Sequence, residues 1–185
     1  MDRRLTSSDG DWIRQAVRRY ESRLLTYALH LLHDRERARD VVQETFLKLC
    51  TQQPDRIQSH LAEWLFTVCR NACVDIQRKE SRMRPLDVTA AGNEQTDVPS
   101  PADRLEQTES TSTVLRMLGG LPPNQQEVIR LKFQHGLSYQ QISNVTGLSV
   151  TNVGFLLHTG IKTVRTRIES QDVAGQGTAS GLITS

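Results

Sequence analysis

The feature that most constrains the fold is the segment of residues 85–112, "PLDVTAAGNEQTDVPSPADRLEQTESTS". It is rich in Pro, Ser, Thr and acidic residues and poor in large apolar residues. Because such a composition cannot bury enough apolar surface to fold, it predicts a flexible acidic linker. The linker leaves residues 1–84 and 113–169 as two separate segments, each large enough for one small domain. Residues 170–185 are small and polar and predict a disordered tail.

Both segments are predicted to be helical. Apolar residues recur at spacings of three and four, and no stretch alternates apolar and polar residues over the length of a strand. In the first segment Asp34 is expected to cap a helix that ends near Cys50. A third helix is expected from about Ser59 to Met83, with the apolar stripe Leu61, Leu65, Val68, Ala72 and Ile76. These elements predict a small helical bundle.

The second segment carries the local signals of a helix-turn-helix. Ser138 and Gln141 predict a capping box, Gly147 a turn, and Ser149 the cap of the last helix. The apolar stripe of that last helix is Val150, Val153, Leu157, Ile161, Val164 and Ile168. The fold class expected from the whole chain is therefore all-α, with a helical bundle and a helix-turn-helix joined by the linker.

Charge is unevenly distributed along a chain whose net charge is only +2. Residues 1–84 and residues 121–168 each contain four more basic than acidic side chains, whereas residues 85–120 contain four more acidic ones. Two basic segments beside an acidic one favour two modules that meet a polyanion. Ordinary solvated surface charge is the alternative.

The N-terminus and the cysteines bear on the compartment. No apolar run follows the first basic residues, and none reaches the length of a membrane span, so neither a secretory signal nor a membrane partner is expected. Cys50, Cys69 and Cys73 cannot all pair internally, which favours reduced thiols in a cytoplasmic protein.

The polar flank of the helix predicted over residues 59–83 has the side chains that single-stranded DNA requires. At about 100° per residue, one row contains Trp64, Thr67, Asn71, Asp75, Arg78 and Arg82. An aromatic ring can stack on a base, Asn or Thr can meet base edges, and Arg can meet phosphates. The alternative is that Trp64 lies in the core and the arginines are solvated.

Two further helix faces are candidates for binding. In the helix over residues 34–50, Asp40, Glu44 and Leu47 point away from the apolar stripe. This face suits a partner protein with a basic, partly apolar surface. The alternative is an ordinary solvated helix face. Opposite the stripe of the last helix, and following Ser149, are Thr151, Asn152, Phe155, Thr159 and Lys162. A recognition helix inserts such side chains into the major groove. A plain helical hairpin is the alternative reading.

Enzymatic chemistry is not expected. The sequence contains no glycine-rich phosphate loop, no HExxH motif and no evident nucleophile–base pair. Cys69 and Cys73 are spaced so that they could share a metal ion with a histidine, but Cys69 leans toward the core. We therefore expect neither a catalytic residue, nor a metal, nor a cofactor.

Four stretches resemble a known family. "LLTYALHLLHDRERARDVVQETFLKL", "EWLFTVCRNACVDIQRKESR", "LPPNQQEVIRLKF" and "GLSYQQISNVTGLSVTNV" occur in this order, with the acidic linker between the second and third. They resemble an extracytoplasmic-function sigma factor of bacterial RNA polymerase. The resemblance covers about residues 12–84 as region 2 and residues 113–168 as region 4.

The resemblance implies roles for these faces. Asp40, Gln43 and Glu44 would dock on the clamp helices of the β′ subunit of core RNA polymerase. The row from Trp64 would capture the non-template strand of the minus-ten element, and the loop Gln53–His60 would hold a flipped-out base. Region 4 would read the minus-thirty-five element of promoter DNA and sit on the flap of the β subunit. The linker would run toward the RNA exit path, and an anti-sigma factor is an expected partner.

The sequence departs from the family pattern at several positions. Arg37 and Arg39 stand where acidic residues are usual, which predicts weaker docking, and Ser143 replaces a usual Ala. Gly154, Leu156 and Thr159 stand where Lys and Arg are common, which predicts fewer phosphate contacts on the last helix. Two alternatives follow: a stand-alone helix-turn-helix regulator that does not bind core polymerase, and a sigma-like protein that has lost this binding.

Overall fold

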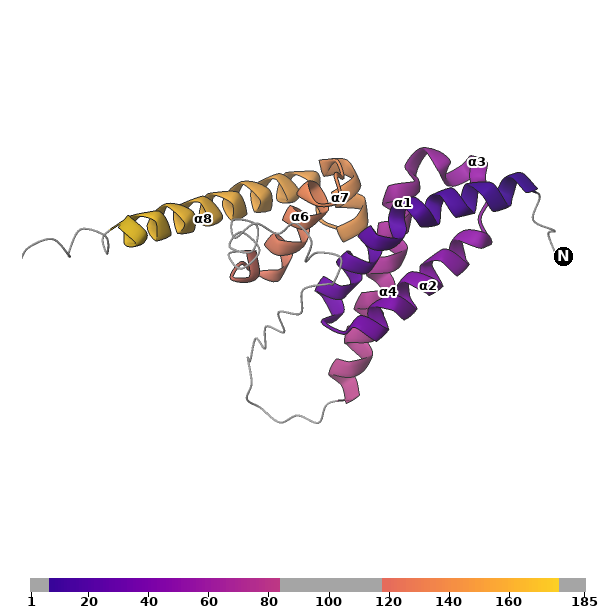
Figure 1. Cartoon of the computed structure of the whole chain (residues 1–185), viewed down its shortest axis with the longest axis horizontal. Coiled ribbons are helices and arrows are strands. Elements are labelled where there is room, and N and C mark those ends of the chain that lie inside the picture. Colours follow the sequence, from indigo (N-terminus) through magenta and orange to yellow (C-terminus); the bar gives the residue numbers. More distant parts are fainter. Residues whose placement is uncertain (1–6, 84–117, 177–185) are drawn as a thin grey trace, which may run out of the picture. The chain divides into compact units, whose positions relative to one another are not determined.

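The computed structural model describes residues 7–83 and 118–176, and every regular element in these ranges is helical (Figure 1). The predicted all-α fold class is confirmed for them. Contacts divide these helices into two units, one containing α1 to α4 together with α7, and one containing α6 and α8. The predicted linker, residues 85–112, lies outside the described residues.

Apart from α7, the first unit is a bundle of three long helices and two short ones. Its elements are α1 (Ser7–Leu32), α2 (Arg35–Cys50), α3 (Pro54–Ile57), the 3-10 helix η1 (Gln58–His60) and α4 (Leu61–Met83). Helices α1, α2 and α4 pack against one another in pairs. Tyr27 and Phe66 are buried and meet edge to face, with ring centroids 5.3 Å apart. Burying such side chains is the main stabilising contribution, about 1.5–3 kcal/mol each.

The corner between α1 and α2 is built by two residues. His33 ends α1 with φ 54°, a left-handed conformation that is uncommon for a residue other than glycine. Asp34 then caps α2, because its Oδ1 accepts hydrogen bonds from the backbone N–H groups of Glu36 and Arg37 at 3.0 and 3.1 Å. The predicted cap at Asp34 is confirmed.

The predicted buried stripe of the third helix is wrong in part. The fully buried residues of α4 are Leu65, Phe66, Cys69 and Cys73, whereas Val68, Ala72 and Ile76 are only half-buried. The buried face is thus turned by about one residue from the predicted one. The prediction followed aliphatic residues alone. In the structure both α1 and α2 contact α4, and the side of α4 that lies between these two helices is the buried one.

In the second unit α6 (Pro123–Phe133) packs against α8 (Val150–Gln176). The predicted stripe of α8 is wrong at Val150 and Ile161, which are 40% and 39% exposed. Gly160 lies on the buried line instead, and a Cβ there would come 2.8 Å from Cδ1 of Ile129. The glycine therefore leaves room for the end of the Ile129 side chain of α6, a role that an apolar pattern does not reveal.

Helix α7 (Tyr139–Thr146) begins and ends as predicted. Ser138 and Gln141 form the reciprocal capping box, and Gly147 closes the helix in the left-handed conformation with φ 76°. The final helix runs further than expected, since α8 includes residues 170–176, which were assigned to the tail. No proline interrupts this stretch, and extending an existing helix costs little per residue.

Candidate nucleic-acid and protein interfaces

The exposed face of α2 is acidic with one apolar side chain. Asp40, Gln43, Glu44 and Leu47 are all exposed, and Leu47 is 61% exposed. Glu44 pairs with Lys48 one turn further on, with 2.8 Å between Nζ and Oε1. The opposite face is buried, as Ala38, Val42 and Leu49 show. The face predicted for a partner protein is thus free of core packing and presents an apolar group between polar ones.

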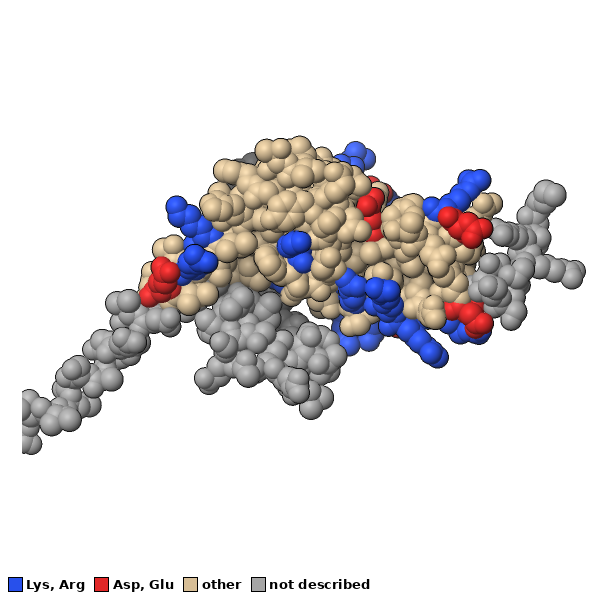
Figure 2. Space-filling model, turned by 90° about the horizontal axis from the view of Figure 1, so that it is seen from above, with Lys and Arg blue, Asp and Glu red and all other residues tan. Residues whose placement is uncertain are grey.

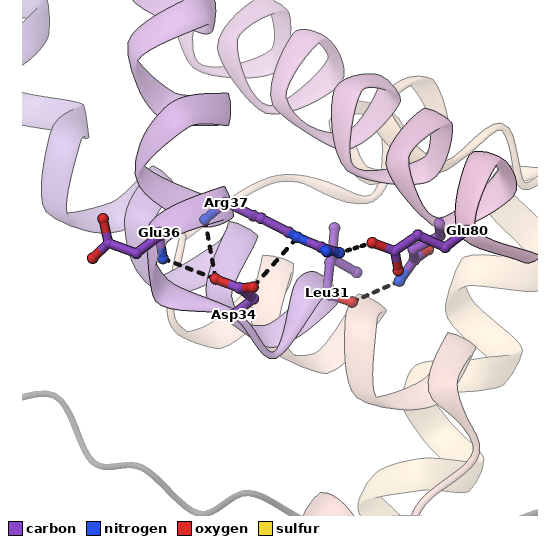
Figure 3. Close-up of polar contacts among 6 residues, drawn as sticks. Leu31, Asp34, Glu36, Arg37 and Glu80 are labelled. Atoms are coloured by element: carbon purple, nitrogen blue, oxygen red, sulfur yellow. Dashed lines mark hydrogen bonds and ion pairs between the residues drawn. The ribbon is translucent and has the colours of Figure 1, made fainter. Parts of the chain in front are cut away.

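The two arginines that depart from the family pattern are both paired within the first unit. Arg37 forms an ion pair with Asp34, with Nε and Oδ2 3.3 Å apart, and a second one with Glu80 of α4 (Figure 3). Arg39 pairs with Glu36, with 2.9 Å between Nη1 and Oε1. Their charges are therefore partly compensated before any partner arrives, which reduces the repulsion that the sequence predicts.

The predicted row on α4 lies opposite the buried face. Asn71, Arg78 and Arg82 are exposed, while Trp64 and Thr67 are half-buried. The Thr67 hydroxyl donates to the carbonyl oxygen of Glu63 at 2.8 Å, so it is partly occupied by its own helix. Asp75 is exposed on the same side. The structure thus brings a ring, an amide and two guanidinium groups together on one helix side.

The segment before this row is more regular than predicted. The expected loop Gln53–His60 consists of α3 followed by η1. Ile57 is buried and anchors it, while Gln58, Ser59 and His60 are exposed. The Ser59 hydroxyl and Nδ1 of His60 are 3.2 Å apart. Polar groups therefore stand on a short rigid turn directly before the first residue of α4.

The outward face of α8 is polar and almost uncharged at its start. Thr151, Asn152 and Phe155 are exposed, and Phe155 is 61% exposed. Ser149 is exposed but acts as the helix cap, since its Oγ accepts from the backbone N–H of Asn152 at 3.2 Å. Lys162 is exposed two turns beyond Phe155. Most of the predicted reading face is thus accessible.

Thr159 is not part of that exposed face, although the 3.6-residue period of the helix places it on this side. It is half-buried, its hydroxyl donates to the carbonyl of Phe155 at 2.9 Å, and it lies 3.3 Å from Nε2 of Gln125 in α6. His158 is exposed on the same side, between Phe155 and Lys162, and the sequence reasoning missed it. Its spacing of three and four residues from these neighbours is the signal that would have found it.

The positive charge of the second module is less accessible than its sequence suggests. Arg130 is buried, and burial lowers the pKa of its guanidinium to about 10, so it stays protonated at neutral pH. Arg167 is half-buried and donates to the carbonyl of Gly120 at 3.1 Å. Lys162 and Arg165 are exposed. Figure 2 shows basic side chains over the C-terminal part of α8, beside surface that carries neither charge.

The cysteines are the remaining candidates for chemistry in the described part of the chain. Cys50, Cys69 and Cys73 are free, and the pKa of Cys69 is raised by a hydrogen bond with Cys73 and by burial, which keeps it a thiol. Within residues 7–83 and 118–176, no group of three or more His, Cys, Asp or Glu is arranged to hold a metal ion. In the same ranges no helix is both long and apolar enough to cross a membrane.

Comparison with protein families assigns both modules. Residues 16–83 match the model of sigma-70 region 2, and residues 112–168 match that of sigma-70 region 4. The chain is 30% identical over 153 residues to the ECF RNA polymerase sigma factor SigL of Mycobacterium tuberculosis, covering 81% of this chain and 85% of SigL. It is 27% identical over 150 residues to the RNA polymerase sigma factor YlaC of Bacillus subtilis, covering 80% of this chain and 87% of YlaC.

A solved structure shares the fold. The sigma factor RpoE of Bartonella quintana, crystallised with the anti-sigma factor NepR, superposes with a TM-score of 0.60 at 20% identity. The match covers 84% of this chain and 96% of RpoE.

Proposed function

Because this chain belongs to the extracytoplasmic-function sigma factors of RNA polymerase, with sigma-70 regions 2 and 4, we propose a division of that function among its exposed faces. Sigma factors direct promoter-specific transcription initiation and are not enzymes, so the chemistry belongs to core polymerase. The faces on α2, α4 and α8 supply docking, strand capture and upstream recognition in turn. This activity takes place in the cytoplasm, where core polymerase meets the chromosome.

Docking is the role of the α2 face. Asp40, Gln43 and Glu44 meet basic groups on the β′ clamp helices, and Leu47 enters an apolar contact between them. The support is the exposure of all four side chains on a face opposite the core. An apolar group surrounded by polar ones is the usual composition of a protein interface.

Strand capture is the role of the α4 row. Trp64 stacks on a base of the non-template minus-ten strand, Asn71 and Thr67 meet base edges, and Arg78 and Arg82 neutralise phosphates. The turn over Gln53–His60 receives a flipped-out base. The support is that ring, amide and guanidinium groups share one side of one helix, with the polar turn directly before it.

Upstream recognition is the role of α8. Thr151, Asn152 and Phe155 enter the major groove of the minus-thirty-five element, while Lys162 meets a phosphate. The region also rests on the β flap. Because RpoE of Bartonella quintana was crystallised with an anti-sigma factor, an anti-sigma factor that covers these faces is the proposed negative control.

One observation carries the proposal: the polar and basic row on α4 and the acidic face of α2 lie on the same unit. A stand-alone helix-turn-helix regulator has no use for that combination. Permanganate footprinting of a promoter, with core polymerase alone, the chain alone, and both, tests it. We expect reactive minus-ten thymines only when both are present. A chain that shifts the DNA but gives core polymerase no new reactive thymines would contradict the proposal.

A further inference from the structure

We infer that Arg37 is a positioning residue, which fastens the start of α2 to the far end of α4 and so holds the DNA-facing arginines of α4 in place. The sequence predicts a different role for it, a misplaced charge on the docking helix. The inference rests on the proposed function, because it concerns how the α4 row is held.

The contacts form a clasp of four side chains at the α1–α2 corner (Figure 3). Asp34 caps α2 through Oδ1 and holds Arg37 through Oδ2, with 3.3 Å to Nε. Arg37 then reaches across to Glu80 on α4. Beside this pair, Nε2 of Gln77 donates to the carbonyl oxygen of Leu31 at 2.6 Å, at the end of α1. Two residues of α4, Gln77 and Glu80, are thus tied to one corner.

The clasp lies beyond the fully buried part of α4. Among residues 61–82 of this helix, Cys73 is the last fully buried one, and Arg78 and Arg82 lie in the turns that follow. At about 100° per residue, Gln77 and Glu80 point to the side opposite those two arginines. The contacts of Gln77 and Glu80 therefore hold this end of α4 from the side opposite Arg78 and Arg82, which is the side proposed to meet phosphates.

The pair is half-exposed, 49% at Arg37 and 43% at Glu80, so its effect is modest. Exposed ion pairs couple by an amount equivalent to about a two- to fivefold change in an equilibrium constant. The sign of that change is diagnostic. Removing the acid Glu80 leaves the chain more basic, so simple attraction to DNA predicts stronger binding, whereas loss of the clasp predicts weaker promoter opening.

The experiment is a double-mutant cycle in the holoenzyme with Arg37→Gln, Glu80→Gln and the two combined. Core affinity and the fraction of open complex are measured for each at equal holoenzyme concentration. Arg37→Gln and Glu80→Gln should each lower the open fraction about two- to fivefold, and the double variant should be no worse than either. Arg37→Lys should retain most of the opening, and core affinity should be unchanged throughout.

Arg39→Gln is the matched control, since it removes the same charge from α2 but breaks only a pair with Glu36 of the same helix. It should open promoters like the wild type. Stronger opening by Glu80→Gln, additive losses in the double variant, or a parallel fall of core affinity and opening would each overturn the inference.

Arg78→Ala in the same series separates this inference from the proposed function. If Arg78→Ala opens the promoter poorly while Glu80→Gln opens it normally, the clasp has no positioning role and the row stands. If Arg78→Ala opens it normally, the proposed row is wrong, and the inference falls with it.

Discussion

The sides of α4 and α8 that we propose to face DNA differ in how they combine charge with recognition. On α4, two exposed arginines continue the line of Trp64 and Asn71 along one helix side. On α8, Thr151, Asn152 and Phe155 stand at the start of the helix, and the first exposed basic side chains, Lys162 and Arg165, come two turns later. Affinity and specificity are therefore joined on α4 and largely separated on α8.

Under the proposed function, this difference accounts for how a weakly charged helix would read a promoter. Phosphate contacts supply affinity without sequence information, whereas base edges supply specificity. A helix with few phosphate contacts binds poorly alone, but polymerase holds it beside its site while region 2 binds the same DNA. The resulting effective concentration compensates for the weak grip. Breaking the attachment to polymerase should thus affect both sides, and the α8 side most.

The largest effect is expected from Glu44→Arg on the docking face. Reversing an exposed charge that would face a basic partner creates like-charge repulsion, which costs several kcal/mol and so weakens core binding by about a hundredfold or more. Glu21→Arg makes the same charge change on the exposed surface of α1 and serves as the control. Retention on immobilised core polymerase measures both. Normal retention of a folded Glu44→Arg variant would remove α2 from the interface.

Next in size are Asn71→Ala and Arg78→Ala on the α4 row. Each removes a hydrogen-bonding group from the captured strand and should lower open-complex stability by roughly 1–2 kcal/mol, with core binding intact. Trp64→Ala is a poorer probe because Trp64 is half-buried, so its loss can also affect folding. Lys79→Ala, exposed next to Arg78, is the control. Permanganate footprints identical to wild type in both variants would show that another face captures the strand.

A smaller and more local effect is expected from Phe155→Ala on α8. The exposed ring can pack against thymine methyl groups in the major groove. The variant should lose preference at one or two thymines of the minus-thirty-five element, at about 1–3 kcal/mol there. Transcription from promoters carrying uracil, which lacks the methyl group, at each thymine measures this. Equal responses of wild type and Phe155→Ala to every uracil would assign the ring to the flap or an anti-sigma factor.

The smallest effect is expected from Thr159→Val. The Thr159 hydroxyl bonds to its own helix and lies 3.3 Å from Nε2 of Gln125 in α6, so we expect it to contribute to folding rather than to base recognition. We expect unchanged minus-thirty-five preference and a loss of folding stability of about 1 kcal/mol, read from promoter competition and thermal unfolding. An altered base preference would return Thr159 to the reading face.

Sequence reasoning succeeded where a residue acts through its own helix. The cap at Asp34, the capping box at Ser138 and the exposed sides of α2 and α4 all follow from local chemistry and a 3.6-residue period. The family resemblance assigned the function that the comparisons show. These features need no knowledge of neighbouring helices.

It failed where tertiary contacts decide. Gly160 is buried because α6 approaches α8 there, and one partner of Arg37 and one of Thr159, Glu80 and Gln125, lie on other helices. The apolar period of one helix carries no information about which residues of a neighbouring helix it will contact. Arg37 shows this most clearly, since the same residue reads as a docking defect in sequence and as part of a clasp in the structure.

Transcription from a randomised promoter library by core polymerase and this chain tests the account most directly. The wild type should select two motifs at a fixed spacing. Asn71→Ala should change only the downstream motif, and Phe155→Ala only the upstream one. If no motif is selected with core polymerase present, or if either variant alters both motifs alike, the division of work between α4 and α8 is contradicted.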